Sequence, residues 1–253
     1  MKHAVISGGA GGLGRALSSC LQAEGWAVAL LDLSTDGLEK SATQLPLTCD
    51  LTDPLSLADA MARVAEWSGG AVDLAIYNAG VTQIGGFADS DAASHRRVFE
   101  INYFAAVEMA RALLAPVRAA QGTHLAISSV AGFSPLYQRT AYAASKHALE
   151  GFFGSLRSEE RVHGVHVAIA APSFVATNIG KPERGADGIA RPGSAADGVD
   201  YMTPEQAAGE ILRGLNRRRD FIPVGRVARL AWRINRLSPR LFQRLMERNI
   251  SGT

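Results

Sequence analysis

A short apolar run passes directly into glycines near the start of the chain, where residues 3–14 read HAVISGGAGGLG. An unbroken apolar run is typical of a buried parallel strand, and residues 13–24 place apolar side chains at helical spacing. Glycines at such a junction permit a tight turn and let the backbone approach a pyrophosphate, whose charge suits the free N–H groups and positive dipole end of the following helix. This strand–glycine–helix unit therefore predicts a nucleotide-binding α/β fold.

An acidic residue, Asp32, closes the next apolar run, 26–31, and lies 24 residues after Gly8. A carboxylate at the end of a second strand can accept hydrogen bonds from both hydroxyls of an adenosine ribose, and it repels a 2′-phosphate. Neither Leu33 after it nor Gly11 in the glycine loop is basic. We therefore expect NAD as the cofactor and NADP as the less favoured one.

Apolar runs and stretches of helical periodicity alternate to about residue 225. This alternation implies right-handed crossovers and a parallel sheet. We expect an α/β, doubly wound Rossmann fold over residues 1–225, with a seven-stranded, mainly parallel sheet and helices on both faces. A long irregular loop is expected over 178–200, which is rich in Gly, Ala, Asp and Pro. The expected strands are 2–7, 26–31, 45–49, 72–77, 123–128, 165–170 and 221–224, and the expected helices are 13–24, 55–67, 91–120, 141–163 and 204–215.

The composition fits one large α/β domain, because 47% of the 253 residues are hydrophobic and 20% are charged. No stretch approaches the ~20 apolar residues of a membrane span, and the first apolar run is too short for a signal peptide. We therefore expect a cytoplasmic protein. Cys20 and Cys49 are expected to be reduced core thiols, and since no metal-ligand spacing surrounds them, no metal site is expected.

The sequence resembles the short-chain dehydrogenase/reductase family over about residues 1–225. The Tyr-x-x-x-Lys motif of that family is matched by Tyr142 and Lys146, its serine by Ser129, 13 residues before the tyrosine, and its helical asparagine by Asn102. The resemblance implies an oxidoreductase that exchanges a hydride between NAD(H) and a secondary alcohol or ketone, with these four residues as the catalytic set. It also implies a homodimer or homotetramer.

The spacing of Tyr142 and Lys146 suits proton transfer, because residues four apart share one helix face. A free phenol has a pKa of about 10, so a nearby ammonium and a positively polarised nicotinamide are expected to lower the pKa of Tyr142. The resemblance implies that Lys146 binds the nicotinamide ribose, Ser129 donates to the substrate oxygen and Asn102 positions a water that links Lys146 to solvent. Ser128 is expected to point to the opposite face of the sheet.

Further cofactor contacts follow from the resemblance. Gly8, Gly12 and Gly14 match the Gly-x-x-x-Gly-x-Gly loop, and residues 172–177, PSFVAT, resemble Pro-Gly-x-Val-x-Thr with Ser173 in place of the glycine. The expected cofactor-binding residues are Ser7, Gly8, Gly11, Gly12, Leu13, Gly14, Asp32, Leu33, Asp50, Leu51, Asn78, Ala79, Gly80, Tyr142, Lys146, Pro172, Val175 and Thr177.

Substrate contacts should come from loops at the carboxyl ends of the strands. Those loops contain Ile84, Phe87, Phe133, Leu136, Tyr137, Phe174 and Ile179, which indicates a mainly apolar pocket. We expect a lipophilic substrate, such as a steroid-like, retinoid-like or long-chain compound. Its expected contacts are Ser129, Phe133, Leu136, Tyr137 and Phe174.

Charge is unevenly spread along the chain. Residues 213–248 contain eleven arginines against Asp220 and Glu247, so this stretch carries +9 and the remainder carries −7. Residues 226–253 are expected to form a basic amphipathic helical extension, split at Pro239. Such an extension can pack on its own body as a lid, pack on a second subunit, or make peripheral contact with an anionic membrane. No recognition motif accompanies the arginines, so no nucleic-acid partner is expected.

Three other functional classes compete with an enzyme of this kind. A nucleotide-sensing regulator would keep the fold without turnover, but it would be expected to lose Tyr142 or Lys146, and both are present. A membrane-surface protein would act through the basic extension with little turnover. A sugar-nucleotide epimerase shares the catalytic pair but typically has a longer carboxyl-terminal substrate domain.

Overall fold

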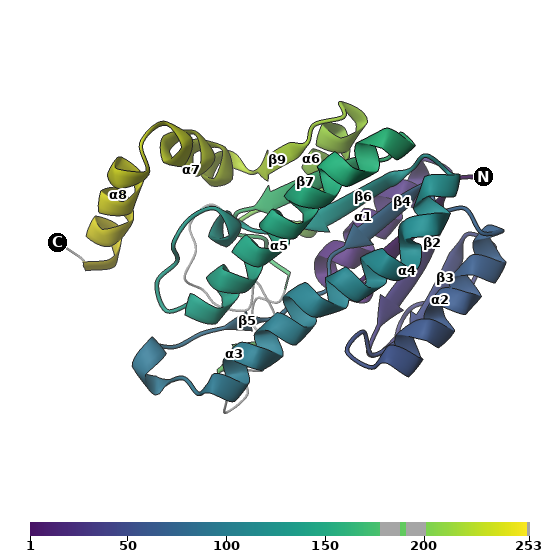
Figure 1. Cartoon of the computed structure of the whole chain (residues 1–253), viewed down its shortest axis with the longest axis horizontal. Coiled ribbons are helices and arrows are strands. Elements are labelled where there is room, and N and C mark those ends of the chain that lie inside the picture. Colours follow the sequence, from purple (N-terminus) through teal and green to yellow (C-terminus); the bar gives the residue numbers. More distant parts are fainter. Residues whose placement is uncertain (178–187, 191–200, 252–253) are drawn as a thin grey trace.

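A single seven-stranded sheet forms the centre of the protein (Figure 1). The computed structural model describes residues 1–177, 188–190 and 201–251, the last six by backbone alone. The strand order is β3-β2-β1-β4-β6-β7-β9, and every pairing is parallel. The expected seven-stranded sheet is confirmed. Its strands are β1 (His3–Ser7), β2 (Ala27–Asp32), β3 (Gln44–Thr48), β4 (Leu74–Tyr77), β6 (Thr123–Ile127), β7 (His166–Pro172) and β9 (Phe221–Val224).

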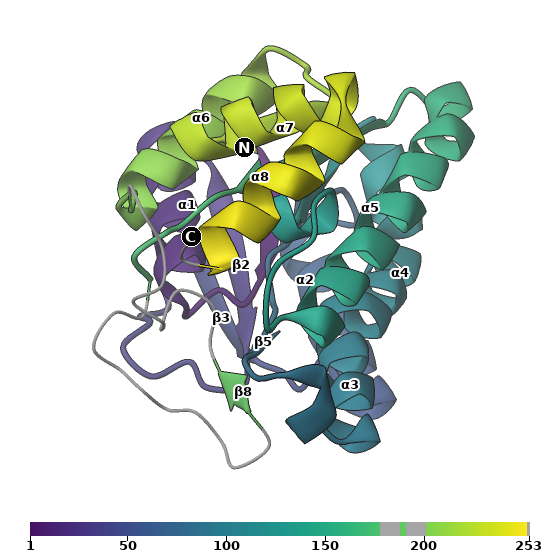
Figure 2. The same cartoon turned by 90° about the vertical axis from the view of Figure 1, so that its left-hand side faces the viewer.

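Helices cover both faces of this sheet (Figure 2). One face carries α1 (Gly12–Ala23) and α6 (Pro204–Asn216), and the other carries α2 (Pro54–Ser68), α4 (Ala105–Ala119) and α5 (Thr140–Glu160). Strand side chains alternate between the two cores: Ala4 and Ile6 pack with the first group of helices, whereas Val5 packs with the second. The doubly wound architecture is therefore confirmed. The strand order reverses between β1 and β4, which is where ligands bind in such sheets.

Two local features differ from the expectation. The helix expected over 91–120 is divided into α3 (Ala92–Phe99), a π-helical turn (Glu100–Phe104) and α4. Hydrophobic periodicity does not show this division, because the chain stays helical through the wider turn. Within the expected loop 178–200, Ile189–Ala190 form β8, which pairs antiparallel with β5 (Thr82–Gln83). A strand of two residues is too short to show the alternation of apolar and polar side chains from which strands are predicted.

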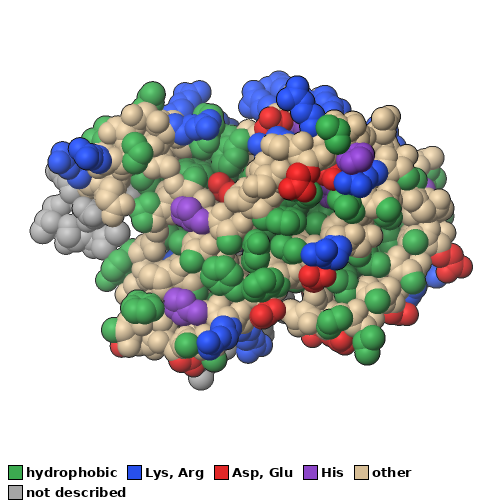
Figure 3. All heavy atoms as spheres, viewed as in Figure 1, with side chains coloured by type: hydrophobic (Ala, Val, Ile, Leu, Met, Phe, Trp, Pro, Cys, Tyr) green, Lys and Arg blue, Asp and Glu red, His purple; other side chains and the backbone are tan. Residues whose placement is uncertain are grey.

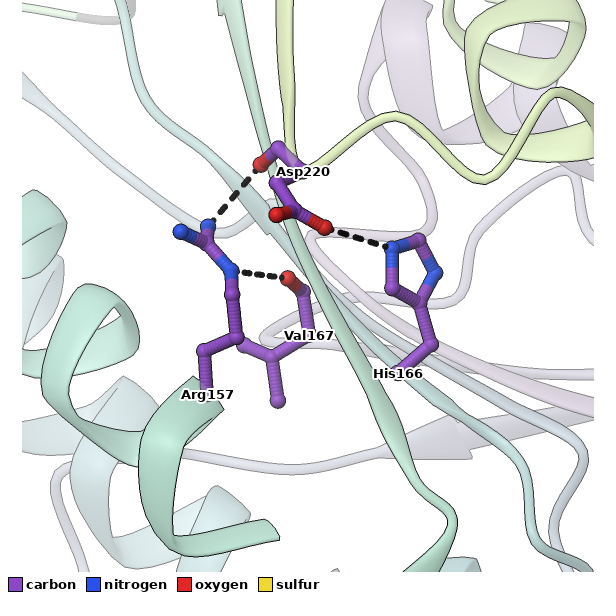
Figure 4. Close-up of polar contacts among 4 residues, drawn as sticks. All are labelled: Arg157, His166, Val167 and Asp220. Carbon is purple, nitrogen blue, oxygen red and sulfur yellow. Dashed lines mark hydrogen bonds and ion pairs between the residues drawn. The ribbon is translucent and has the colours of Figure 1, made fainter. Parts of the chain in front are cut away.

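A polar clamp fixes the edge strand β9 to the long helix α5 (Figure 4). Arg157 of α5 donates from Nε to the Val167 carbonyl at 2.7 Å and from Nη2 to the Asp220 carbonyl at 2.9 Å. The Asp220 carboxylate also lies 3.3 Å from His166 Nε2. Burial lowers the pKa of His166, and the hydrogen bond to Asp220 opposes that shift. The clamp holds the strand from which the last two helices continue.

The carboxyl-terminal extension consists of α7 (Arg226–Leu237) and α8 (Pro239–Ser251). The division at Pro239 is confirmed. Trp232 of α7 stacks on Phe221 with ring centroids 5.8 Å apart, and Asn235 Nδ2 donates to the Phe133 carbonyl at 2.6 Å. The extension therefore packs on the body of its own chain, at the carboxyl ends of the strands (Figures 1 and 2). Among the described residues, no helix combines the length and apolar character needed to cross a bilayer.

Candidate active site

A cavity of about 2020 Å³ opens along the carboxyl ends of the strands. The glycine loop and Asp32 line one end, the loops after β4 and β6 and the start of α5 line the middle, and α7 and α8 line the other end. Small-molecule pockets usually measure about 300–1,000 Å³. The cavity therefore has room for a dinucleotide together with a second ligand.

The glycine loop leaves space for an anion against the start of α1. Gly8 has φ +64°, a conformation that favours glycine, and a Cβ at Gly14 would clash with the Gly8 carbonyl. Gly11 is the N-cap of α1 and has no side chain that could bond the first free amides of the helix. Those amides and the bare backbone fit a pyrophosphate at this position.

Asp32 and Arg15 both line the cavity at the end that the glycine loop forms. The Asp32 carboxylate accepts from Ala10 N and from Leu33 N, each at 2.9 Å. Arg15 donates to three backbone carbonyls at 2.8 Å and also lines the cavity. Arg15 was not among the expected cofactor residues, because it lies in the helical turn after the glycine loop, neither next to Asp32 nor within the loop.

Most of the expected cofactor residues line the cavity, and two do not. Ser7 is buried behind the loop, where its hydroxyl accepts from Asn78 N at 3.0 Å and Ala79 N at 3.1 Å. Gly14 packs against the backbone of the glycine loop instead of facing the cavity. Both positions support the site from behind. The expected residues that line it are Gly8, Gly11, Gly12, Leu13, Asp32, Leu33, Asp50, Leu51, Asn78, Ala79, Gly80, Tyr142, Lys146, Pro172, Val175 and Thr177.

Three of the four residues expected to act in catalysis, Ser129, Tyr142 and Lys146, line the cavity, whereas Asn102 is buried and does not line it. Tyr142 and Lys146 lie on one face of α5, with Lys146 Nζ 5.9 Å from the Tyr142 ring centroid and 2.9 Å from the Ile127 carbonyl. The Ser129 hydroxyl follows β6 and hydrogen-bonds the Tyr142 phenol. Asn102, in the π-helical turn, accepts from Val81 N at 2.8 Å and donates to Ser145 Oγ at 2.9 Å. These bonds fix the Asn102 side chain beside Lys146.

Burial has the largest effect on the pKa values of Tyr142 and Lys146. It raises the pKa of Tyr142, although the hydrogen bond from Ser129 and the charge of Arg139 oppose the shift. It also lowers the pKa of Lys146 to about 8, against the attraction of Glu150. In the protein alone, desolvation outweighs the hydrogen bond from Ser129 and the charge of Arg139. The expected fall in the pKa of Tyr142 concerns the site with the positively polarised nicotinamide bound, and it stays a prediction.

Comparison with known proteins agrees with this geometry. The family described as short chain dehydrogenase matches residues 2–187.

The chain belongs to the short-chain dehydrogenase family.

Its relatives include the Dehydrogenase/reductase SDR family member 7B of Bos taurus, 34% identical over 96% of this chain and 79% of that protein. The Drosophila melanogaster Dehydrogenase/reductase SDR family protein 7-like is 30% identical over 95% of this chain and 78% of the relative. A short chain dehydrogenase from Burkholderia cenocepacia J2315 in complex with NADP shares the fold, with a TM-score of 0.84 and 20% identity over 97% of this chain and 99% of that one. A Burkholderia phymatum short chain dehydrogenase/reductase in complex with NAD has a TM-score of 0.75 and 22% identity over 87% and 88% of the two chains.

This short-chain dehydrogenase also contains a partly buried carboxylate that sequence reasoning missed. Glu150 lies one turn after Lys146 on α5, and its Oε1 accepts from Ser128 Oγ at 2.6 Å. Burial raises the pKa of Glu150 to about 7, although Ser128 and Lys146 oppose the shift. The expectation that Ser128 faces away from Ser129 is wrong: both hydroxyls reach α5, because the chain turns into a 3-10 helix at Val130–Gly132.

Four apolar side chains expected near the substrate line the cavity, and the rest of the expected set differs in detail. Ser129, Ile84, Leu136, Tyr137 and Phe174 line it. Phe133 does not: its ring lies against Phe221, at 5.9 Å between centroids. Phe87 also does not, because it packs on His95, and Ile179 lies outside the described residues. The apolar residues that sequence reasoning missed come from the last two helices: Val227, Leu230, Ala231, Ile234, Phe242 and Leu245.

The described residues offer no metal site, since no three His, Cys, Asp or Glu side chains among them come together. Cys20 and Cys49 are free thiols, the first partly buried and the second buried.

Proposed function

We propose that this short-chain dehydrogenase interconverts a lipophilic secondary alcohol and the corresponding ketone with NAD(H), and that Tyr142 transfers the proton. One observation carries the proposal: Tyr142, Ser129 and Lys146 meet midway between a glycine loop suited to a pyrophosphate and an apolar chamber. When bound, the dinucleotide supplies the ring that accepts or donates the hydride and, in its oxidised form, a positive charge.

Each polar group has a separate task in this scheme. In the oxidative direction the Tyr142 phenolate takes the hydroxyl proton of the alcohol, and in the reductive direction the phenol returns it. Ser129 donates to the substrate oxygen, where negative charge develops. Lys146 binds a ribose hydroxyl and favours the phenolate, and Asn102 positions a water that connects Lys146 to solvent. Because burial raises the pKa of Tyr142, added positive charge beside the phenol is what makes it a base near neutrality.

The cofactor preference is assigned to Asp32. Its carboxylate faces the cavity at the end of β2, where it would accept the ribose hydroxyls of NAD and repel a 2′-phosphate. Arg15 at the same end is the group that could tolerate NADP, but its guanidinium already serves three carbonyls. The balance favours NAD.

The substrate class and the oligomeric state are proposed from the cavity lining and from the outer surface. The apolar lining from Leu136, Phe174 and α7 supports a steroid-like, retinoid-like or long-chain substrate. We further propose a cytoplasmic homodimer or homotetramer. Figure 3 shows hydrophobic side chains gathered over α4 and α5, where Phe104 is 46% exposed, and an exposed apolar patch of this kind suits a subunit interface.

A panel of lipophilic secondary alcohols, assayed with NAD and with NADP, tests the function. The expected result is reduced nicotinamide with at least one alcohol, and a higher kcat/KM with NAD. A protein that binds dinucleotide tightly but turns over none of the panel would favour the regulator instead. A protein that binds neither dinucleotide would overturn the proposal.

A further inference from the structure

The outer face of α7 and of the first half of α8, up to residue 245, is basic. Residues 226–245 contain six arginines and no acidic residue, whereas the rest of the chain has 20 basic and 24 acidic residues. Arg229 is paired with Glu210 at 2.9 Å, and the other five arginines are exposed. Figure 3 shows Lys and Arg side chains along the edge of the molecule formed by these helices. The exposed arginines are Arg226, Arg233, Arg236, Arg240 and Arg244.

Large apolar side chains stand exposed among these arginines. Leu237 is 87% exposed, Leu230 is 61% exposed, and Leu241 and Leu245 are 51% and 40% exposed. Leu230 and Leu245 also line the cavity that contains Tyr142. The same leucines therefore belong to the outer surface and to the wall of the substrate chamber.

Contacts with the body of the protein fix the orientation of α7 and α8. Trp232 stacks on Phe221, Asn235 bonds the Phe133 carbonyl, and Phe242 of α8 is only 5% exposed. These contacts fix the inner faces of the two helices. The exposed arginines and leucines thus hold fixed positions and form a preformed surface.

We propose that this outer face of α7 and α8 docks on an anionic lipid bilayer, so that the substrate chamber opens toward the lipid. Arginines at an anionic surface attract lipid phosphates, while leucines between them enter the boundary of the acyl chains. A second copy of the chain fits less well, because a two-fold contact through this face would set arginine against arginine. A nucleic acid would use the arginines but would leave the leucines in water. Delivery of a lipophilic substrate from the bilayer rests on the proposed function, whereas the docking itself does not.

Sedimentation of the full chain with lipid vesicles tests the docking without any need for turnover. Vesicles of phosphatidylcholine are compared with vesicles that also contain phosphatidylglycerol, at low and at high salt. We expect binding to the anionic vesicles that weakens with salt. The double variant Arg233→Gln/Arg240→Gln should bind about thirtyfold more weakly, because each arginine near the surface adds roughly 1 kcal/mol of attraction. Leu237→Ser/Leu241→Ser should also lose binding, at unchanged net charge.

Matched controls remove the same groups elsewhere on the surface. Arg63→Gln/Arg161→Gln removes two exposed arginines from outside α7 and α8, and Leu55→Ser removes a leucine that is 81% exposed on α2. Both should bind vesicles like the parent. Absence of binding to anionic vesicles overturns the proposal, and so does equal weakening by the control variants. A monomer–dimer equilibrium that only the α7 and α8 variants disturb would also overturn it and assign the face to a second copy. If the parent protein binds anionic vesicles but turns over none of the alcohols in the panel, that result counts against the proposed function and not against the docking.

Discussion

Glu150 gives the most quantitative prediction about the site. Its folded-state pKa is about 7 against an ordinary value of 4.5, and a shift of that size corresponds to about 3 kcal/mol. Because the folded-state pKa is the higher one, the folded protein holds the proton more tightly than the unfolded chain does. The stability that this adds is fully present below pH 4.5 and is lost as the pH rises through about 7. Glu150→Gln keeps an acceptor for Ser128 and removes the titration.

The assay is chemical unfolding of the parent and of Glu150→Gln across this pH range. The unfolding free energy of the parent, relative to the variant, should fall by up to about 3 kcal/mol as the pH rises through the window. Glu66→Gln, which removes an exposed glutamate from α2, should give a curve parallel to that of the parent. A flat difference between the parent and Glu150→Gln would refute the reasoning.

Three further changes have defined outcomes. Asp32→Asn should lower the ratio of kcat/KM for NAD over NADP by at least about tenfold, because a hydrogen bond to a charged group adds roughly 1.5–3 kcal/mol; steady-state kinetics with both cofactors measure it, and an unchanged ratio contradicts the role of Asp32. Gly14→Ala should abolish tight dinucleotide binding in calorimetry, because the added Cβ meets the Gly8 carbonyl, whereas Gly209→Ala, which meets only the end of the Arg213 side chain, should not. Asn235→Ala should lower the unfolding free energy by about 1 kcal/mol, because it removes the hydrogen bond that joins α7 to the Phe133 carbonyl. The same change should raise the KM for the substrate. A KM equal to that of the parent would show that α7 does not contribute to substrate binding.

The sheet could be predicted from the sequence because the patterns that indicate its strands are local in the chain. A short stretch of sequence is enough to recognise the apolar run at His3–Ser7, the glycines after it and Asp32. The structure places each of them at the edge of the sheet where ligands bind. Tyr142 and Lys146 were equally accessible, since a spacing of four on a helix fixes their common face.

The contacts that sequence reasoning missed join segments far apart in the chain. Phe133 packs on Phe221 instead of facing the cavity, because the edge strand β9 and α7 come to lie beside it. Ser128 finds Glu150, and the wall from α7 and α8 completes the chamber. Hydrophobic periodicity predicts that a helix has an apolar face, but it does not tell which surface that face will cover.

The phenol of Tyr142 is the group on which the proposed reaction depends, and Tyr142→Phe removes its oxygen while keeping the ring. The decisive measurement is turnover of this variant beside its affinity for the dinucleotide. We predict that kcat falls by about 10²–10⁴-fold, as for loss of a general acid–base group, with the dinucleotide affinity unchanged. Turnover at the rate of the parent, with the cofactor bound, would contradict proton transfer by Tyr142.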